Sequence, residues 1–128
     1  MKIAICAQGK GKDAPVDFRF GRCRYFVIVD SEDDTVESFD NPAVGAPGGA
    51  GVQAGQFLIN QGVDVLLAGN LGPNAASVVH NSGIEVFSGI HGTVADTLNS
   101  YEAGELNKAT QATVGPHYGS RGGRRRRR

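Results

Sequence analysis

Short apolar runs separated by polar or glycine-rich turns fill the first 107 residues and predict one α/β domain. Residues 2–7 and 63–68 are apolar except for Lys2 and Asp64, which is typical of strands that are buried on both faces, and residues 84–87 form a further short strand. Residues 25–30 are a strong strand signal, and residues 35–40 alternate between apolar and polar positions. The polar turn between these last two segments predicts a hairpin whose second strand has one solvated face.

Three segments show the spacing of amphipathic helices. The first covers residues 52–60, where Ala54, Phe57 and Leu58 recur at helical spacing, and the second begins at Pro73 and ends at residues 81–83. The third follows Thr93, which has Asp96 three residues later in the arrangement of a capping box, and it ends at Gly104. The order of elements is therefore β-β-β-α-β-α-β-α.

This order predicts the topology of the sheet. Strand-helix-strand units require parallel pairing with right-handed crossovers, so residues 2–7, 63–68 and 84–87 should lie parallel, and the hairpin should extend the sheet antiparallel on one side. We predict an α/β fold with a mixed five-stranded sheet and helices on both faces, formed by residues 1–107. Residues 108–128 are polar, rich in glycine and arginine, and are expected to form a flexible tail.

A glycine-dense loop, residues 41–54, is the leading candidate for a binding site. Gly48, Gly49 and Gly51 would leave backbone N–H groups uncovered, and the helix that follows would add unpaired donors and the positive end of its dipole. An ordinary surface loop is the competing interpretation. The G-x-G-x-x-A match at residues 49–54 lacks both a preceding strand and an acidic residue about twenty positions later, which speaks against a dinucleotide site.

Further candidates for holding an anion follow the predicted strands. In sheets of this kind ligands bind beyond the carboxyl ends of the parallel strands. Asn70 and Asn74 lie in the turn after the strand at 63–68, and Arg19 and Arg22 lie in a long basic loop. Amide and guanidinium groups at this rim would favour a negatively charged ligand.

Three residues are candidate ligands for a soft metal or for a metal–sulfide cluster at the same rim. Cys6 ends the first strand, Cys23 lies between two arginines that would lower its thiol pKa if it were exposed, and His91 lies in a loop after the strand at 84–87. A core or turn position is the competing interpretation for each of them.

The formal net charge of zero conceals an uneven distribution. Six of the thirteen basic residues are Arg121 and Arg124 to Arg128, whereas residues 1–120 carry seven basic and thirteen acidic side chains. A nucleic-acid-associated protein that uses this arginine tail is therefore an alternative function, although the acidic domain would repel phosphate. Six acids at positions 30–40 are interpreted as protection of an edge strand rather than as a metal site.

Several function classes lack support in the sequence. It contains no Cys-x-x-Cys, no His-x-x-x-His and no serine in a nucleophile elbow, so we expect a protein that is not an enzyme. Two cysteines do not make a disulfide framework, and no apolar run reaches eighteen residues. We expect a soluble cytoplasmic protein without a membrane partner.

Several motifs together resemble the dinitrogenase iron–molybdenum cofactor biosynthesis family, which includes carriers of the NifX type and the C-terminal domain of NifB. The matching segments are residues 17–22, 25–30, 41–43, 48–51, 62–66, 72–75, 83–84 and 93–94. The resemblance implies a ribonuclease-H-like fold without that enzyme's catalytic carboxylates. It further implies binding of an iron–molybdenum cofactor precursor or a related Mo/Fe or Mo/Cu sulfide cluster, which some relatives hold noncovalently, and a protein that donates or accepts the cluster. Many members carry tails rich in histidine or cysteine, whereas this tail offers only His117 and arginines.

Overall fold

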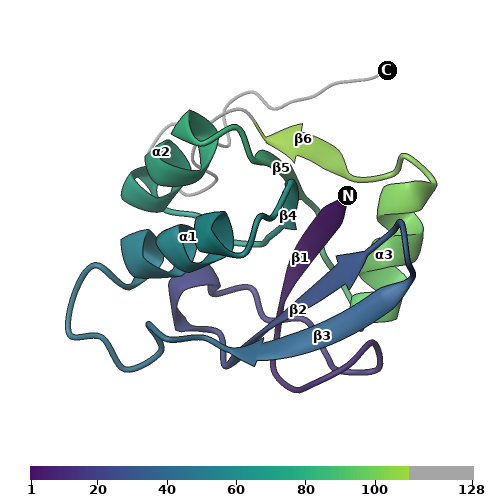
Figure 1. Ribbon diagram of the computed structural model, residues 1–128, viewed down its shortest axis with the longest axis horizontal. Helices are drawn as coiled ribbons and strands as arrows, with labels where there is room; N and C mark the ends of the chain where they lie inside the picture. Colours follow the sequence, from purple (N-terminus) through teal and green to yellow (C-terminus); the bar gives the residue numbers. More distant parts are fainter. Residues whose placement is uncertain (110–128) are drawn as a thin grey trace.

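The computed structural model describes residues 1–109, which form a six-stranded mixed sheet with helices on both faces (Figure 1). The strands lie in the order β3-β2-β1-β4-β5-β6. β1, β4 and β5 are parallel, and β2, β3 and β6 are antiparallel to their neighbours. In chain order the elements are β1 (Lys2–Ala7), the 3₁₀ helix η1 (Phe20–Arg22), β2 (Tyr25–Asp30), β3 (Thr35–Asp40), α1 (Ala50–Asn60), β4 (Val65–Leu67), α2 (Pro73–Asn81), β5 (Glu85–Ser88), α3 (Val94–Glu102) and β6 (Asn107–Ala109).

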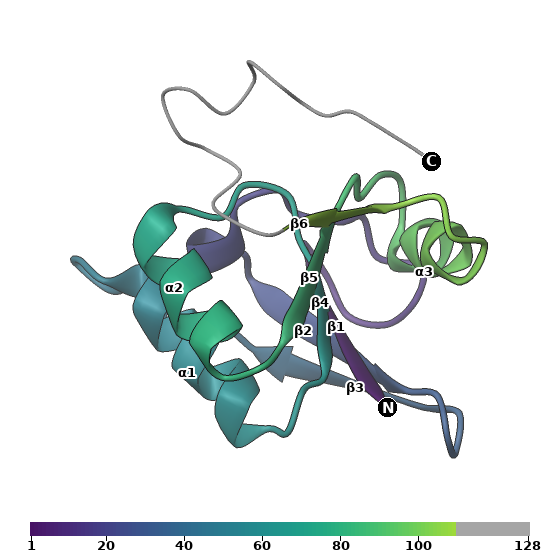
Figure 2. The same ribbon diagram turned by 90° about the horizontal axis from the view of Figure 1, so that it is seen from above.

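The sheet separates two apolar layers (Figure 2). α1 and α2 pack side by side on one face, and α3 covers the other together with the loop after β1. The central strands β1 and β4 are buried on both faces, which explains why their sequences are continuously apolar. Four aromatic rings, those of Phe20, Phe26, Phe39 and Phe57, pack in series at centroid separations of 5.7–5.9 Å and join η1, β2, β3 and α1.

The predicted hairpin and the predicted parallel strands are confirmed. The hairpin strands pair from Tyr25 with Asp40 to Asp30 with Thr35, and β2 pairs antiparallel with β1. α1 begins two residues earlier than predicted, at Ala50, because Gly49 takes a left-handed conformation (φ 69°) and turns the chain into the helix.

The number of strands was predicted wrongly, because the sheet contains a sixth strand, β6. Its three residues, Asn-Lys-Ala, have no apolar alternation, so nothing local identifies them as a strand. β6 exists because it pairs with β5, and Lys108 adds an ion pair with Glu85 at 3.0 Å. The strand takes in two residues that the sequence analysis had placed in the tail. Residues 110–128, the rest of that predicted tail, lie outside the described part of the chain.

The basic loop between β1 and β2 is anchored at several points. Gln8 N–H donates to the carbonyl of Pro15 at 2.8 Å, and Val16 N–H donates to the carbonyl of Gly92 at 3.0 Å. Because these bonds hold the loop across the carboxyl end of β1, η1 reaches the first turns of α1 and α2.

No helix in residues 1–109 is long and apolar enough to cross a membrane.

Candidate functional site

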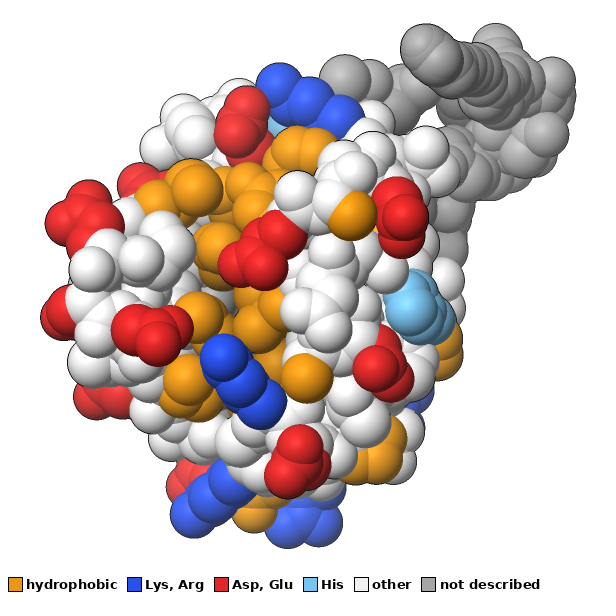
Figure 3. Space-filling view, turned by 90° about the vertical axis from the view of Figure 1, so that its right-hand side faces the viewer, with side chains coloured by type: hydrophobic (Ala, Val, Ile, Leu, Met, Phe, Trp, Pro, Cys, Tyr) orange, Lys and Arg blue, Asp and Glu red, His pale blue; other side chains and the backbone are white. Residues whose placement is uncertain are grey.

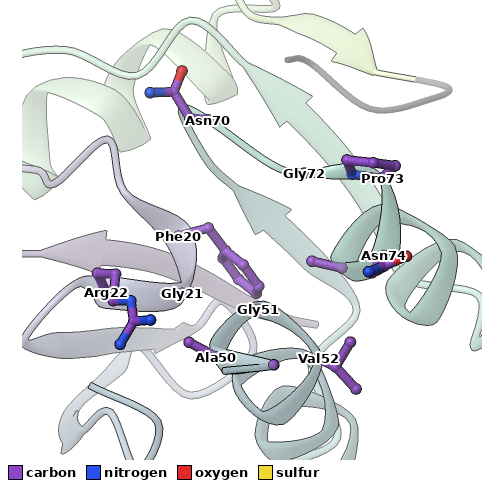
Figure 4. Close-up of a pocket in the computed structure, with 12 residues that line it drawn as sticks. Phe20, Gly21, Arg22, Ala50, Gly51, Val52, Asn70, Gly72, Pro73 and Asn74 are labelled. Atoms are coloured by element: carbon purple, nitrogen blue, oxygen red, sulfur yellow. The ribbon is translucent and has the colours of Figure 1, made fainter. Parts of the chain in front are cut away.

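A pocket of about 370 Å³ lies where η1 meets the first turns of α1 and α2 (Figure 4). Its lining comes from three segments that are distant in the sequence, residues 20–22, 49–52 and 70–75 except Leu71. Asn70 follows β4 closely, so the pocket lies beyond the carboxyl end of a parallel strand. The glycine-dense loop, the basic loop and the turn after β4 therefore meet at one place, as their positions in the predicted sheet suggested.

Two helix N-termini that lack side-chain caps face this pocket. Gly49 is the N-cap of α1 and Gly72 is the N-cap of α2, and neither helix has an acidic residue in its first turn. The first N–H groups with a partner inside their own helix are those of Gln53, bonded to Gly49, and Ala76, bonded to Gly72. Five earlier N–H groups belong to pocket-lining residues and lack a partner within their helix; these are Ala50, Gly51, Val52, Asn74 and Ala75.

The third helix, α3, does not line this pocket and is capped differently. The hydroxyl of Thr93 accepts the N–H of Asp96 at 3.2 Å, and the carboxylate of Asp96 accepts the N–H of Thr93 at 3.0 Å. This capping box uses the donors of α3 internally. The donors of α1 and α2 remain available to a ligand that can accept hydrogen bonds and carries negative charge.

The pocket depends on a close approach between backbones. A Cβ at Gly21 would lie 2.8 Å from the backbone nitrogen of Gly51, and a Cβ at Gly51 would lie 3.0 Å from the Cβ of Ala75. Glycine at positions 21 and 51 therefore allows η1, α1 and α2 to pack closely against one another at the pocket.

Arg22 supplies the positive charge at the pocket. Its guanidinium Nη1 donates to the carbonyl of Ala46 at 2.6 Å and to that of Val44 at 3.4 Å, so it also fixes the glycine-dense loop. The residues that line the pocket include no Asp or Glu. The groups that face the pocket thus combine positive helix ends, one guanidinium and no carboxylate, which disfavours a bare metal cation and favours an anion.

Arg19, the other arginine predicted to bind the ligand, lies outside the pocket lining and pairs with Asp17. Its Nε and Nη2 donate to the two carboxylate oxygens at 3.1 and 2.9 Å, and its backbone N–H donates to the same carboxylate at 2.9 Å. Burial by itself raises the pKa of Asp17, but the hydrogen bonds and charge of Arg19 outweigh it and the pKa is lowered. This pairing commits the Arg19 side chain to shaping the loop.

The predicted soft ligands do not line the pocket. Cys6 and Cys23 are both fully buried, and the Cys23 thiol donates to the carbonyl of Phe20 at 3.4 Å. Burial, followed by a hydrogen bond with Cys23, raises the pKa of the Cys6 thiol well above its ordinary value, so this thiol stays protonated at neutral pH. The condition of an exposed thiol, on which the expected activation of Cys23 depended, is not met.

His91 lies on the α3 side of the sheet. Its Nε2 is 2.8 Å from the hydroxyl of Ser100, and its backbone N–H donates to Thr97, so both contacts are made with α3. Across residues 1–109, no group of three or more His, Cys, Asp or Glu side chains could hold a metal ion. The acids of the β2–β3 hairpin are included in that statement.

Some of the predicted site residues are therefore neighbours and others are not. Arg22, Gly49, Gly51, Asn70 and Asn74 line one pocket. Gly48 lies one residue before the pocket-lining segment 49–52. Arg19, Cys6, Cys23 and His91 do not line the pocket. Gly72 lies in the turn after β4, which was expected to help hold a negative charge. Gly21 was not predicted, although the Phe-Gly-Arg turn that contains it is the kind of signal that could have identified it.

Three comparisons with known proteins agree with one another. Residues 1–104 match the family model described as dinitrogenase iron-molybdenum cofactor. The apo form of the orange protein from Desulfovibrio gigas is 37% identical, with a TM-score of 0.83 over 87% of this chain and 94% of that one. A NifB-like protein from Thermotoga is 34% identical, with a TM-score of 0.78 over 88% of this chain and 97% of that one.

A relative known from sequence supports the same grouping. An uncharacterized protein of Methanocaldococcus jannaschii is 30% identical over 92 residues, which are 70% of this chain and 78% of the relative. The family model covers nearly all of the described fold, including the three segments that form the pocket. The chain belongs to the dinitrogenase iron-molybdenum cofactor family.

Proposed function

We propose that this protein binds an anionic metal–sulfur cluster as cargo in the pocket between η1, α1 and α2, and that it acts as a carrier or scaffold rather than as an enzyme. The observation on which the proposal depends is the meeting of two uncapped helix N-termini and Arg22 in a pocket whose lining contains no carboxylate. Family membership supports a cargo related to the iron–molybdenum cofactor.

The physical argument rests on charge and on bulk. A helix N-terminus stabilises an adjacent negative charge by about 0.3–1 kcal/mol at an exposed position, and two such ends with a guanidinium act together on one ligand. A pocket of about 370 Å³ has room for a polynuclear cluster. Because both thiols are buried, the cluster would be held noncovalently, through hydrogen bonds from N–H groups to its sulfide ligands.

The cargo is an iron–molybdenum-cofactor precursor or a related Mo/Fe or Mo/Cu sulfide, and its donor or acceptor is another protein. We also propose that the fold of this chain is ribonuclease-H-like, as the family resemblance implies. The arginine run at residues 121–128 lies outside the described residues, and no contact in the described part of the chain favours the nucleic-acid alternative.

Metal analysis after reconstitution tests the proposal. The full-length protein is incubated without oxygen with tetrathiomolybdate, with tetrathiomolybdate and copper(I), or with iron and sulfide, then desalted. Molybdenum, copper and iron per chain and the visible spectrum are measured. We expect stoichiometric metal in at least one preparation, and we expect Arg22→Ala to weaken retention about tenfold, which corresponds to about 1.4 kcal/mol for one lost charge-assisted contact.

Arg24→Ala is the matched control, because Arg24 lies over the ring of Tyr25 at 5.7 Å and does not line the pocket. Its retention should equal that of the unmodified protein. Absence of stoichiometric metal in all three preparations would contradict the proposal, and equal losses in the two arginine variants would remove the pocket from it.

A further inference from the structure

The layer that contains the pocket is nearly free of charged side chains. Residues 41–84 include the glycine-dense loop, α1, β4 and α2, and their only Asp, Glu, Lys or Arg is Asp64. Asp64 lies at the other end of the sheet, where its carboxylate accepts the backbone N–H of Lys2 at 2.8 Å. The exposed positions of the two helices are instead uncharged: Val52, Gln53, Gln56, Asn60, Pro73, Asn74, Ser77 and Asn81.

This lack of charge distinguishes one side of the molecule from the other. Figure 3 shows the side formed by α3 and the tip of the β2–β3 hairpin, where acidic side chains are spread over the surface. The solvent face of a helix ordinarily carries charged residues, whereas the centres of protein–protein interfaces are depleted of them. The exposed face of α1 and α2 shares this depletion of charged residues with the centres of interfaces.

Exposed apolar side chains adjoin the pocket. Phe18, Val44 and Val52 are 50%, 46% and 38% exposed, and they are three of the five large hydrophobic residues that are exposed among residues 1–109. Val52 lines the pocket. Val44 accepts a hydrogen bond from Arg22, and Phe18 accepts one from the backbone of Asn70, so both adjoin residues that line it.

Phe18 is exposed and yet firmly positioned. Its carbonyl accepts the N–H of Asn70 at 2.7 Å, and the ion pair between Asp17 and Arg19 fixes the backbone on both sides of it. Its Cα and Cδ1 would lie 2.8 Å from a Cβ at Gly69, so the ring packs directly on that glycine. A rigid aromatic side chain at a surface loses little conformational entropy on binding, which is the property of interface anchors.

We propose that this surface, the exposed sides of α1 and α2 together with Phe18 and Val44, docks onto the protein that exchanges the anion with the pocket. The inference rests on the proposed function, because it assigns the surface to that partner. The partner would offer an apolar hollow to Phe18 and a carboxylate to Arg24, which is exposed. The backbone carbonyl of Arg24 accepts the N–H of Asn41 at 3.0 Å, so Arg24 adjoins the start of the glycine-dense loop.

A heterologous partner fits the site better than a second copy of this chain does. A two-fold contact through this surface would place the same patch of both subunits in the interface. Both pockets would then be covered at once, and neither could pass its anion to another protein. A partner with its own anion site would instead bring donor and acceptor groups together around one ligand.

Site-directed cross-linking followed by binding measurements tests the docking surface. Full-length protein with p-benzoylphenylalanine at position 18 is expressed in its own host and irradiated, and the cross-linked protein is identified by mass spectrometry. The same group at position 36 is the control, because Val36 is 36% exposed on β3, away from the pocket layer. The identified protein is then purified, and its Kd for the unmodified chain and for each variant is measured by calorimetry.

We expect one protein to cross-link from position 18 and not from position 36. Phe18→Ala should weaken its binding about thirtyfold, as truncation of an interface anchor does, and Val36→Ala should change it less than twofold. Raising the salt concentration should weaken the binding, and Arg24→Ala should reduce this dependence on salt. Val44→Gln, which leaves the residues of the core unchanged, should weaken binding independently of Phe18.

Separate outcomes overturn the two proposals. Absence of a cross-link from position 18, equal cross-linking from both positions, a cross-link only to a second copy, or unchanged affinity for Phe18→Ala and Val44→Gln would each overturn the docking surface. Retention of molybdenum after tetrathiomolybdate treatment is measured on the same variants and should be unchanged. If neither the unmodified protein nor any variant retains metal, the proposed function is wrong. A protein that still docks would then have no anion to exchange with the pocket, so its proposed role would be wrong as well.

Discussion

Gly21 sets the distance between η1 and the first turn of α1. A Cβ at this position would lie 2.8 Å from the nitrogen of Gly51, closer than any unstrained contact allows. We expect Gly21→Ala to displace η1 and to cover donors of α1, which weakens retention of a thiomolybdate-derived cluster at least tenfold.

The matched control for that substitution is Gly45→Ala. Gly45 lies in the glycine-dense loop, its backbone is not left-handed, and a Cβ there would meet no atom within 4 Å. Metal per chain and the urea midpoint are measured for both variants. Equal retention in the two would show that the close approach at Gly21 has no part in binding.

The ion pair between Asp17 and Arg19 makes the free energy of unfolding depend on pH, through protonation of Asp17. The pKa of Asp17 is lowered from an ordinary value of 3.8, so the folded state binds the proton less tightly than the unfolded state does. The stabilisation is therefore complete above the unfolded pKa and is lost as the pH falls through the lower folded pKa, that is, below about pH 4.

Asp17→Asn tests this dependence. At pH 7 the substitution should lower the free energy of unfolding by about 2 kcal/mol, the range of a hydrogen bond to a charged group. The difference between the two proteins should narrow as the pH falls below about 4, because the unmodified chain then loses the same ion pair. Urea titrations at several pH values measure both quantities, and a difference that stays constant with pH would refute the assignment.

At the scale of elements, the three helices use their N-termini differently. α3 satisfies its own first turn with a capping box, whereas α1 and α2 begin at glycines and present their N–H groups to the pocket. The lack of side-chain caps on two of the three helices costs some stability. In return, the backbone N–H groups of these two first turns remain available to bind an anion.

A substitution that adds a side-chain cap to α2 should therefore raise the stability of the fold and weaken metal retention. Gly72 has an extended backbone (φ −69°, ψ 167°), and a Cβ there would meet no atom within 4 Å, so Gly72→Asp is tolerated sterically. Its carboxylate would accept N–H groups of the first turn and raise stability by about 0.5 kcal/mol. It would also place a negative charge at the pocket and weaken metal retention at least tenfold.

Thr93→Ala is the control, because it should change the stability of the fold without changing metal retention. Loss of the α3 cap should lower the free energy of unfolding by about 1 kcal/mol and leave metal retention unchanged, because α3 lies on the other face of the sheet. Thermal unfolding and metal analysis are performed on both variants. A Gly72→Asp protein that binds metal normally would exclude the α2 terminus from the site.

At the scale of the whole molecule, charge is separated by layer. The α1–α2 layer carries the pocket and almost no charge, whereas the acids gather on the hairpin, on α3 and near the chain segment after it. The arginine run at residues 121–128 lies outside the described residues. All the groups assigned to the anion lie between residues 20 and 75.

Deleting residues 121–128 should consequently leave metal retention within twofold of the full-length value. Metal per chain and the salt dependence of binding to a nonspecific DNA duplex are measured on both forms. A protein that retains no metal, yet loses a salt-sensitive affinity for DNA on deletion, would support the nucleic-acid function instead. A deletion that removes metal would place a ligand in the tail.

The sequence alone determined most of the elements and most of the topology of this protein, β6 and η1 excepted. Apolar runs at residues 2–7 and 63–68, the hairpin signal and the capping box at Thr93 depend on neighbours within a few positions, so they can be read without tertiary information. The parallel order follows because strand-helix-strand connections have one permitted hand. The same reasoning identified the carboxyl edge of the sheet and the glycine-dense loop.

Only the tertiary structure decided which candidate residues meet. Arg19 and Arg22 are alike in sequence context, but Arg19 faces a buried carboxylate and Arg22 faces the pocket. Cys6 and Cys23 became core residues, and β6 formed from three residues with no strand signal, because packing and pairing between distant segments overrode local preference. The uncapped N-termini of α1 and α2 meet through the contacts of Gly21 and Gly51, which no local pattern specifies.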